Sequence, residues 1–195
     1  MKDLNKRAWK LFLWTGIILV VLASIIMAVL QGNISFWEKQ STSYVDSIRN
    51  LLPEIQSVVP EERRDNTMPV LSLEGRDFIG LLEIPKFQSA LPVGAKWENT
   101  IKYPCCFSGS IYDGTLQIGA TTQNGQYDFY RDISVGDKVY FTDMEGNRFG
   151  LEVKDIRYSK HADQEALQRA DGALTLFIKN IYAFEYIIIT CDVAK

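Results

Sequence analysis

The chain is poor in the residues that most often carry acid–base and metal chemistry. Its 195 residues include one histidine, His161, and three cysteines, Cys105, Cys106 and Cys191. A mechanism that needs a Cys–His or Ser–His pair therefore has a single candidate base, and His161 lies in a polar stretch typical of a solvated loop. An adjacent cysteine pair and one distant cysteine lack the ligand spacing of a zinc site, so we expect no metal and no cofactor.

Positive charge is also scarce beyond the N-terminus. Residues 1–10 hold four basic residues and one acidic residue, which leaves 17 basic and 23 acidic residues in the rest, a net charge of −6. This balance argues against nucleic acid as a partner. Asp113, Asp128 and Asp132 do not form a calcium-loop pattern, and we expect them to be solvated surface residues.

The segment from residue 11 to residue 30 is strongly apolar and contains no charged residue. As a helix it spans about 30 Å, the hydrocarbon thickness of a bilayer. The basic residues Lys2, Lys6, Arg7 and Lys10 precede it. A cleaved signal peptide would have a shorter apolar region and a small-x-small site, which residues 28–31 fit poorly. We predict a cytoplasmic tail over 1–10 and a membrane anchor over 11–30, with the rest of the chain extracytoplasmic.

Residues 31–75 are predicted to form a stalk or linker. Apolar residues recur there at helical spacing: Tyr44, Val45, Ile48, Leu51, Leu52 and Ile55. The pattern predicts a short amphipathic helix that Pro53 kinks or ends. It covers too few heptads for a coiled coil, so we expect this helix to pack beside the following domain.

From residue 76 onward, short β-rich runs alternate with turn residues. The predicted strands are residues 78–84, 91–93, 101–106, 115–121, 138–143, 148–157, 174–178 and 186–193. Residues 144–147 include a glycine and predict a hairpin between two of these strands, and residues 163–168 predict one short helix. This pattern indicates an all-β domain over 76–195, either a closed barrel or a sandwich.

Several of these segments together resemble the sortases, exported cysteine transpeptidases of Gram-positive bacteria. The matching segments, in chain order, are FIGLLEIPK (78–86), LPV (91–93), PCCFSGS (104–110), VGDKV (135–139), FTDMEG (141–146) and LTLF (174–177). The resemblance covers roughly residues 76–195 and implies an eight-stranded β-barrel with short helices. An N-terminal membrane helix and a stalk also fit that family.

The resemblance places three other residues where sortases carry their catalytic cysteine, histidine and arginine. Lys179 stands at the position of the nucleophilic cysteine, which in the family follows the Leu-Thr-Leu strand. Thr121 stands at the histidine position, or Ala120 if the alignment slips by one residue, and Tyr186 stands at the arginine position. These replacements predict a scaffold without transpeptidase activity.

A second alignment places the nucleophile at Cys191, because the pair Thr190–Cys191 also ends an apolar run. Only four residues follow it, too few for a final strand with its arginine, so the barrel would keep an open edge. We therefore expect Cys191 to be a small buried residue of the last strand. Similarity to relatives also suggests a disulfide between Cys105 and Cys191.

Other candidates are weaker. Lys179 could be an amine nucleophile, but no activating partner is visible in the sequence. Cys106 could be a reactive thiol, without supporting neighbours. Four aromatic residues lie in the segments around the aligned site: Tyr112, Tyr127, Phe129 and Tyr130. We expect them to pack in the barrel, with a peptide-holding aromatic groove as the alternative.

The sequence thus predicts a single-pass membrane protein with a sortase-like barrel that lacks the family's chemistry. Its expected partners are the lipid bilayer, through residues 11–30, and a sorting-signal peptide or a surface or pilus protein. Two alternatives stay open: an active transpeptidase that uses Cys191, and a purely structural barrel without a ligand.

Overall fold

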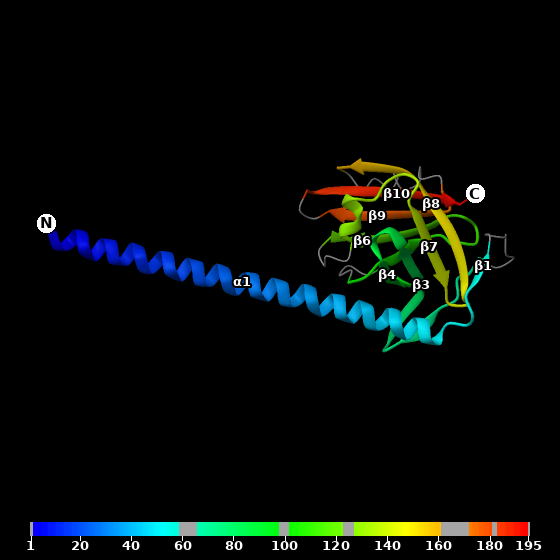
Figure 1. The fold of residues 1–195 in the computed structure, drawn as a ribbon, viewed down its shortest axis with the longest axis horizontal. Helices are drawn as coiled ribbons and strands as arrows, with labels where there is room; N and C mark the ends of the chain where they lie inside the picture. Colours follow the sequence, from blue (N-terminus) through cyan, green and yellow to red (C-terminus); the bar gives the residue numbers. More distant parts are fainter. Residues whose placement is uncertain are drawn as a thin grey trace. The chain divides into compact units, whose positions relative to one another are not determined.

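The computed structural model describes residues 2–58, 66–97, 102–122, 127–160, 172–180 and 183–194 (Figure 1). A single helix, α1 (Lys2–Leu51), is followed by ten strands. The chain divides into two compact units, Met1–Trp37 and Glu38–Lys195, so that α1 contributes to both.

In the first unit, α1 carries the uncharged run. Its described side chains between residues 12 and 30 are all exposed, and the helix is long and apolar enough to cross a membrane. The hydroxyls of Thr15 and Ser24 each donate to a carbonyl of the preceding turn, at 2.9 Å in both cases. Both hydroxyl donors are therefore satisfied within the helix, as a lipid environment requires.

In the second unit, the last turns of α1 pack on strands of the barrel. Tyr44, Val45 and Ile48 are buried in a cluster with Phe78 and Leu81. The helix ends at Leu51, shortly before Pro53, because proline lacks the amide hydrogen that a helix requires. The expected packing of an amphipathic helix beside the domain is confirmed, but the helix is a continuation of the apolar one and not a separate element.

The ten described strands follow α1 in chain order. They are β1 (Gln56–Val58), β2 (Leu71–Leu73), β3 (Arg76–Ile84), β4 (Ser89–Gly94), β5 (Cys105–Ser108), β6 (Leu116–Thr121), β7 (Lys138–Asp143), β8 (Asn147–Ser159), β9 (Leu174–Asn180) and β10 (Glu185–Val193). Two described 3-10 turns, Pro85–Phe87 and Asp128–Arg131, lie between strands.

Eight of these strands, β3 to β10, close into a barrel. The sheet runs in the order β8-β10-β9-β6-β5-β4-β3, and β7 pairs with both β3 and β8 to complete the ring. The pairs β4–β5 and β6–β9 are parallel, and the other barrel pairs are antiparallel. The predicted eight-stranded barrel is therefore confirmed, and closure removes the exposed edges that an open sheet would have.

The β7–β8 hairpin lies where the sequence predicts it. The buried carboxylate of Asp143 accepts hydrogen bonds from the backbone N–H of Glu145 at 2.8 Å and of Asn147 at 2.9 Å. The Tyr112 hydroxyl donates to the same carboxylate at 2.5 Å. Gly146 adopts a φ of 83°, a left-handed conformation that favours glycine. These contacts satisfy a charge that would be costly to bury alone.

Three strands differ from the sequence prediction. The short strands β1 and β2 lie inside the predicted linker, where β1 pairs with β8 and β2 with β3. The compact unit that contains the barrel spans Glu38–Lys195. The predicted strand 101–106 is observed only from Cys105, and residue 101 and the predicted helix 163–168 lie outside the described residues.

Candidate functional site

The three residues that the sequence aligns with the sortase catalytic positions lie side by side in the barrel. Thr121 of β6 pairs with Lys179 of β9, and Lys179 pairs with Tyr186 of β10. Figure 1 shows β6, β9 and β10 as neighbouring strands. We call Thr121, Lys179 and Tyr186 the cross-strand row.

The cross-strand row lies on the outer face of the barrel. The residues one position along each strand, Ala120, Ile178 and Ile187, are buried in the main core. Because neighbouring residues of a strand point to opposite faces, the row points away from that core. Lys179 is exposed, while Thr121 and Tyr186 are partly buried.

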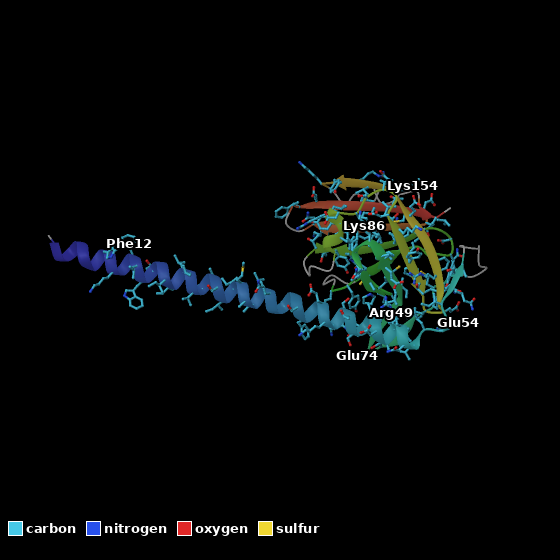
Figure 2. All side chains as sticks on the ribbon, in the orientation of Figure 1. Phe12, Arg49, Glu54, Glu74, Lys86 and Lys154 are labelled. Carbon is cyan, nitrogen blue, oxygen red and sulfur yellow. The ribbon has the colours of Figure 1, made fainter. Side chains whose placement is uncertain are left out.

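The polar groups of the row have no partner among the described residues. The Oγ1 atom of Thr121 is buried without a hydrogen-bond partner. Lys179 forms no salt bridge within the described part of the chain, whereas Lys86 and Lys154, labelled in Figure 2, pair with Asp137 at 2.7 Å and Asp192 at 3.4 Å. The row therefore presents a positive charge on this face that no described residue pairs with.

Next to the row, three aromatic rings pack together on the same face. Trp97 stacks on Phe177 with ring centroids 5.5 Å apart, and Phe107 meets Phe177 edge-on at 5.2 Å. Phe177 is buried, but Trp97 and Phe107 are each 40% exposed. We call these three residues the aromatic shelf.

Gly119 allows the aromatic shelf to lie flat on the sheet. It pairs with Phe177, and a Cβ atom at Gly119 would lie 2.1 Å from the Trp97 ring and 2.4 Å from the Phe177 ring. Only a residue without a side chain permits this approach. Since Gly119 and Phe177 each lie two residues before the cross-strand row on their strands, the shelf and the row share one surface.

The aromatic residues that the sequence singled out do not line this surface. All four are buried in the barrel core: Tyr112, Tyr127, Phe129 and Tyr130. Burial raises the pKa of Tyr127 well above its usual range, so its hydroxyl stays protonated. The expectation of ordinary packing is confirmed, and the aromatic groove built from these residues is absent. The sequence reasoning missed the shelf, for which Gly119 was the only local sign.

Cys191 lies on the inner face of β10. It is 0% exposed and belongs to the main core, beside Leu174. Burial, with a further contribution from the charge of Asp192, raises the pKa of the Cys191 thiol to about 12. A nucleophilic cysteine needs a lowered pKa and access to substrate, and Cys191 has neither.

The disulfide suggested between Cys105 and Cys191 is not formed. Both are free thiols in the structure. The strands β9 and β6 lie between β10, which carries Cys191, and β5, which carries Cys105. With neighbouring strands about 4.8 Å apart, this separation exceeds the reach of a disulfide.

Burial raises the pKa of the half-buried Cys106 thiol, so Cys106 also lacks the lowered pKa of a reactive cysteine.

The remaining candidates add no group to the site within the part of the chain that the structure describes. No group of three or more His, Cys, Asp or Glu side chains suited to a metal ion occurs among the described residues. The Asp113 carboxylate accepts hydrogen bonds from Thr115, as expected of a turn residue. His161 and the side chain of Asp128 lie outside the described residues.

Comparison with known proteins defines the class of fold. No protein-family model and no curated protein matches the chain. Solved structures of sortases do match. Sortase A from Corynebacterium diphtheriae is similar with a TM-score of 0.54 and 19% identity, over 86% of this chain and 85% of that one.

Two further sortase classes give similar values. Sortase C-3 from Streptococcus pneumoniae matches with a TM-score of 0.51 and 16% identity, over 84% of both chains. A Clostridium perfringens Sortase D5 transpeptidase matches with a TM-score of 0.51 and 14% identity, over 60% of this chain and 79% of that one. The fold is thus sortase-like, and at these identities the likeness extends to the fold alone.

Proposed function

We propose that this chain is a membrane-anchored, extracytoplasmic, sortase-like protein without transpeptidase activity. In this proposal it holds a peptide or a protein segment during the assembly of surface proteins. The observation that carries the proposal is the cross-strand row, where the positions aligned with the sortase cysteine, histidine and arginine hold Lys179, Thr121 and Tyr186.

The chemistry of the row supports the absence of acyl transfer. A cysteine transpeptidase requires a thiolate that attacks a carbonyl, a base that moves protons and a cation that stabilises the oxyanion. The row offers an ammonium group, an aliphatic hydroxyl and a phenol, and none of these is a thiolate or an imidazole. Lys179 is exposed to solvent rather than enclosed as an amine nucleophile requires.

The competing function is a transpeptidase that uses Cys191. It would need this thiol to reach a substrate on the outer face of the barrel. The inward direction of Cys191 and its raised pKa argue against that function. Two adjacent strands would have to separate to expose it, which would open the core.

Peptide binding is supported by the aromatic shelf. Trp97 and Phe107 expose large apolar surfaces beside a cation that no described residue pairs with, on a face formed by the four neighbouring strands β5, β6, β9 and β10. Exposed aromatic clusters flanked by polar groups are typical of surfaces that bind a partner. The expected ligand is a sorting-signal peptide or a segment of a surface or pilus protein, as the resemblance to sortases implies.

The experiment that tests this proposal uses the full chain in lipid nanodiscs. The protein is incubated with a fluorescent sorting-signal peptide and an amine, and both binding and covalent products are measured. We expect saturable binding by fluorescence anisotropy and no acyl-enzyme by mass spectrometry. The variant Phe107→Ala should weaken binding, whereas Val135→Ala, which removes an exposed apolar side chain outside the four strands of the site, should not.

Two results would contradict the proposal. An acyl-enzyme that disappears in Cys191→Ala would establish the competing transpeptidase. A lack of saturable binding by any sorting-signal peptide would favour the purely structural barrel.

A further inference from the structure

We propose that the cross-strand row and the aromatic shelf recognise a peptide carboxylate next to an apolar side chain. This inference rests on the proposed peptide-binding function and adds the chemical class of the ligand. The carboxylate is either the free C-terminus of a peptide or an acidic side chain, and both present the same anionic group to the row.

The first argument is the convergence of hydrogen-bond donors. Lysine offers three donors and no acceptor, and the hydroxyls of Thr121 and Tyr186 can each donate one hydrogen bond. The three residues occupy one register position across β6, β9 and β10. Because paired strands lie about 4.8 Å apart, their side chains can reach a single small anion. Charge-assisted hydrogen bonds to a carboxylate are among the stronger ones in proteins.

The second argument concerns the hydroxyl group of Thr121. The buried Oγ1 atom of Thr121 has no partner among the described residues. A buried hydroxyl without a partner is destabilising, and a ligand oxygen that displaces the side chains covering it would satisfy it.

The charges nearest to Lys179 in register do not neutralise it. Glu185, on the same hairpin, pairs with Asn180, and the Glu185 carboxylate lies 3.5 Å from the Asn180 amide nitrogen. Asn180 follows Lys179 directly, so this contact belongs to the opposite face of the sheet. On β8, Asp155 pairs with Arg157. Lys179 therefore keeps a charge available for an external anion.

The third argument is the spacing between charge and rings. Lys179 and Phe177 lie two residues apart on the same face of β9. Two residues of a strand cover roughly 7 Å, which is also one two-residue repeat of an extended peptide. A bound peptide can thus place an apolar side chain on the shelf while a carboxylate one or two residues further on meets the row.

The experiment compares three probes with the full chain in nanodiscs. The first is an acetylated alanine–phenylalanine–alanine tripeptide with a free carboxylate, and the second is its C-terminal amide. The third is an amidated peptide in which aspartate replaces the last alanine. We expect the first or the third probe to bind about threefold to tenfold more tightly than the second, by isothermal titration calorimetry.

The preference for the carboxylate should depend on Lys179. In Lys179→Gln, the acid and amide probes should bind equally, while affinity for the amide should stay as in the unchanged protein. The matched control is Lys138→Gln, which removes an exposed lysine from β7 and should leave the preference intact. The tighter of the first and third probes identifies whether the carboxylate is terminal or belongs to a side chain.

The failure of this inference can be separated from the failure of the proposed function. If the acid and the amide bind equally to the unchanged protein, or if Lys179→Gln keeps the preference, the carboxylate inference is wrong while peptide binding stands. If no probe and no sorting-signal peptide binds, both proposals are wrong.

Discussion

Among single residues, the direction of a side chain on its strand separates Lys179 from Cys191. Both lie on the β9–β10 pair, but Lys179 points outward to solvent and Cys191 points into the core. Because strand residues alternate between faces, a shift of one position in either strand would exchange these environments. The register of this pair therefore decides which group a ligand can meet.

We predict that the Cys191 thiol is unreactive in the folded protein. With a pKa of about 12, roughly one thiol in ten thousand is ionised at pH 8. Iodoacetamide at pH 8 should therefore modify the half-buried Cys106 before Cys191, and Cys191 only after denaturant is added. Peptide mapping by mass spectrometry measures both sites. Equal modification of the two cysteines in the folded protein would contradict the prediction.

The same shift in pKa has a consequence for stability at high pH. The folded thiol keeps its proton to a higher pH than the unfolded one, whose pKa is near 9.0. Its contribution to stability is therefore complete below that pH and declines as the pH rises toward 12.

Among the secondary-structure elements, the end of α1 belongs to the barrel. Ile48 is fully buried against Phe78 and Leu81. Arg49, labelled in Figure 2, donates to the Glu83 carboxylate at 2.7 Å, and Arg148 of β8 pairs with the same carboxylate at 2.7 Å. The Glu83 carboxylate of β3 therefore connects the end of α1 to β8.

We predict that Ile48→Ala lowers the free energy of unfolding by about 2–4 kcal/mol, because it removes a fully buried side chain. The control Leu51→Ala changes a residue of the same helix that is 59% exposed, and should change stability by less than about 0.5 kcal/mol. Urea unfolding of the solubilised full chain measures both. Similar values for the two variants would show that the helix end does not pack on the barrel.

Local sequence signals predicted the elements that depend on local chemistry. The β7–β8 hairpin follows from Asp143 and Gly146, and the long apolar run predicts the first part of α1. The strand prediction also placed Thr121, Lys179 and Tyr186 at strand ends, where the structure pairs them.

The features that sequence reasoning missed depend on distant contacts. The strands β1 and β2 have only three residues each, too few for a periodic pattern, and they exist because β8 and β3 offer them partners. The aromatic shelf requires Trp97, from the chain after β4, to lie over Gly119 of β6. No pattern of residue spacing in the sequence indicates this contact between Trp97 and Gly119.

For the whole molecule, the distribution of charge predicts an orientation in the membrane. Four basic residues precede the apolar run, and the remainder is acidic overall. Basic segments next to a membrane helix stay in the cytoplasm. The proposed surface function requires the barrel on the opposite side.

We predict that an alkaline phosphatase fused after residue 195 is active in cells, because this enzyme needs an extracytoplasmic location to form its disulfides. A fluorescent protein that folds only in the cytoplasm should be bright when fused before residue 1. Moving the basic residues of 1–10 to the segment after Leu30 should reverse both signals. An inactive phosphatase fusion with a stable product would contradict the orientation.

The outward direction of the cross-strand row has one more consequence. Its side chains do not help to fill the barrel, since Ala120, Ile178 and Ile187 do that from the opposite face. The stability of the fold therefore depends little on which side chains occupy these three positions, and the same backbone can carry chemically different residues there. In a barrel of this kind, substitution of three outward-facing residues can change the chemistry of the surface while the fold is retained.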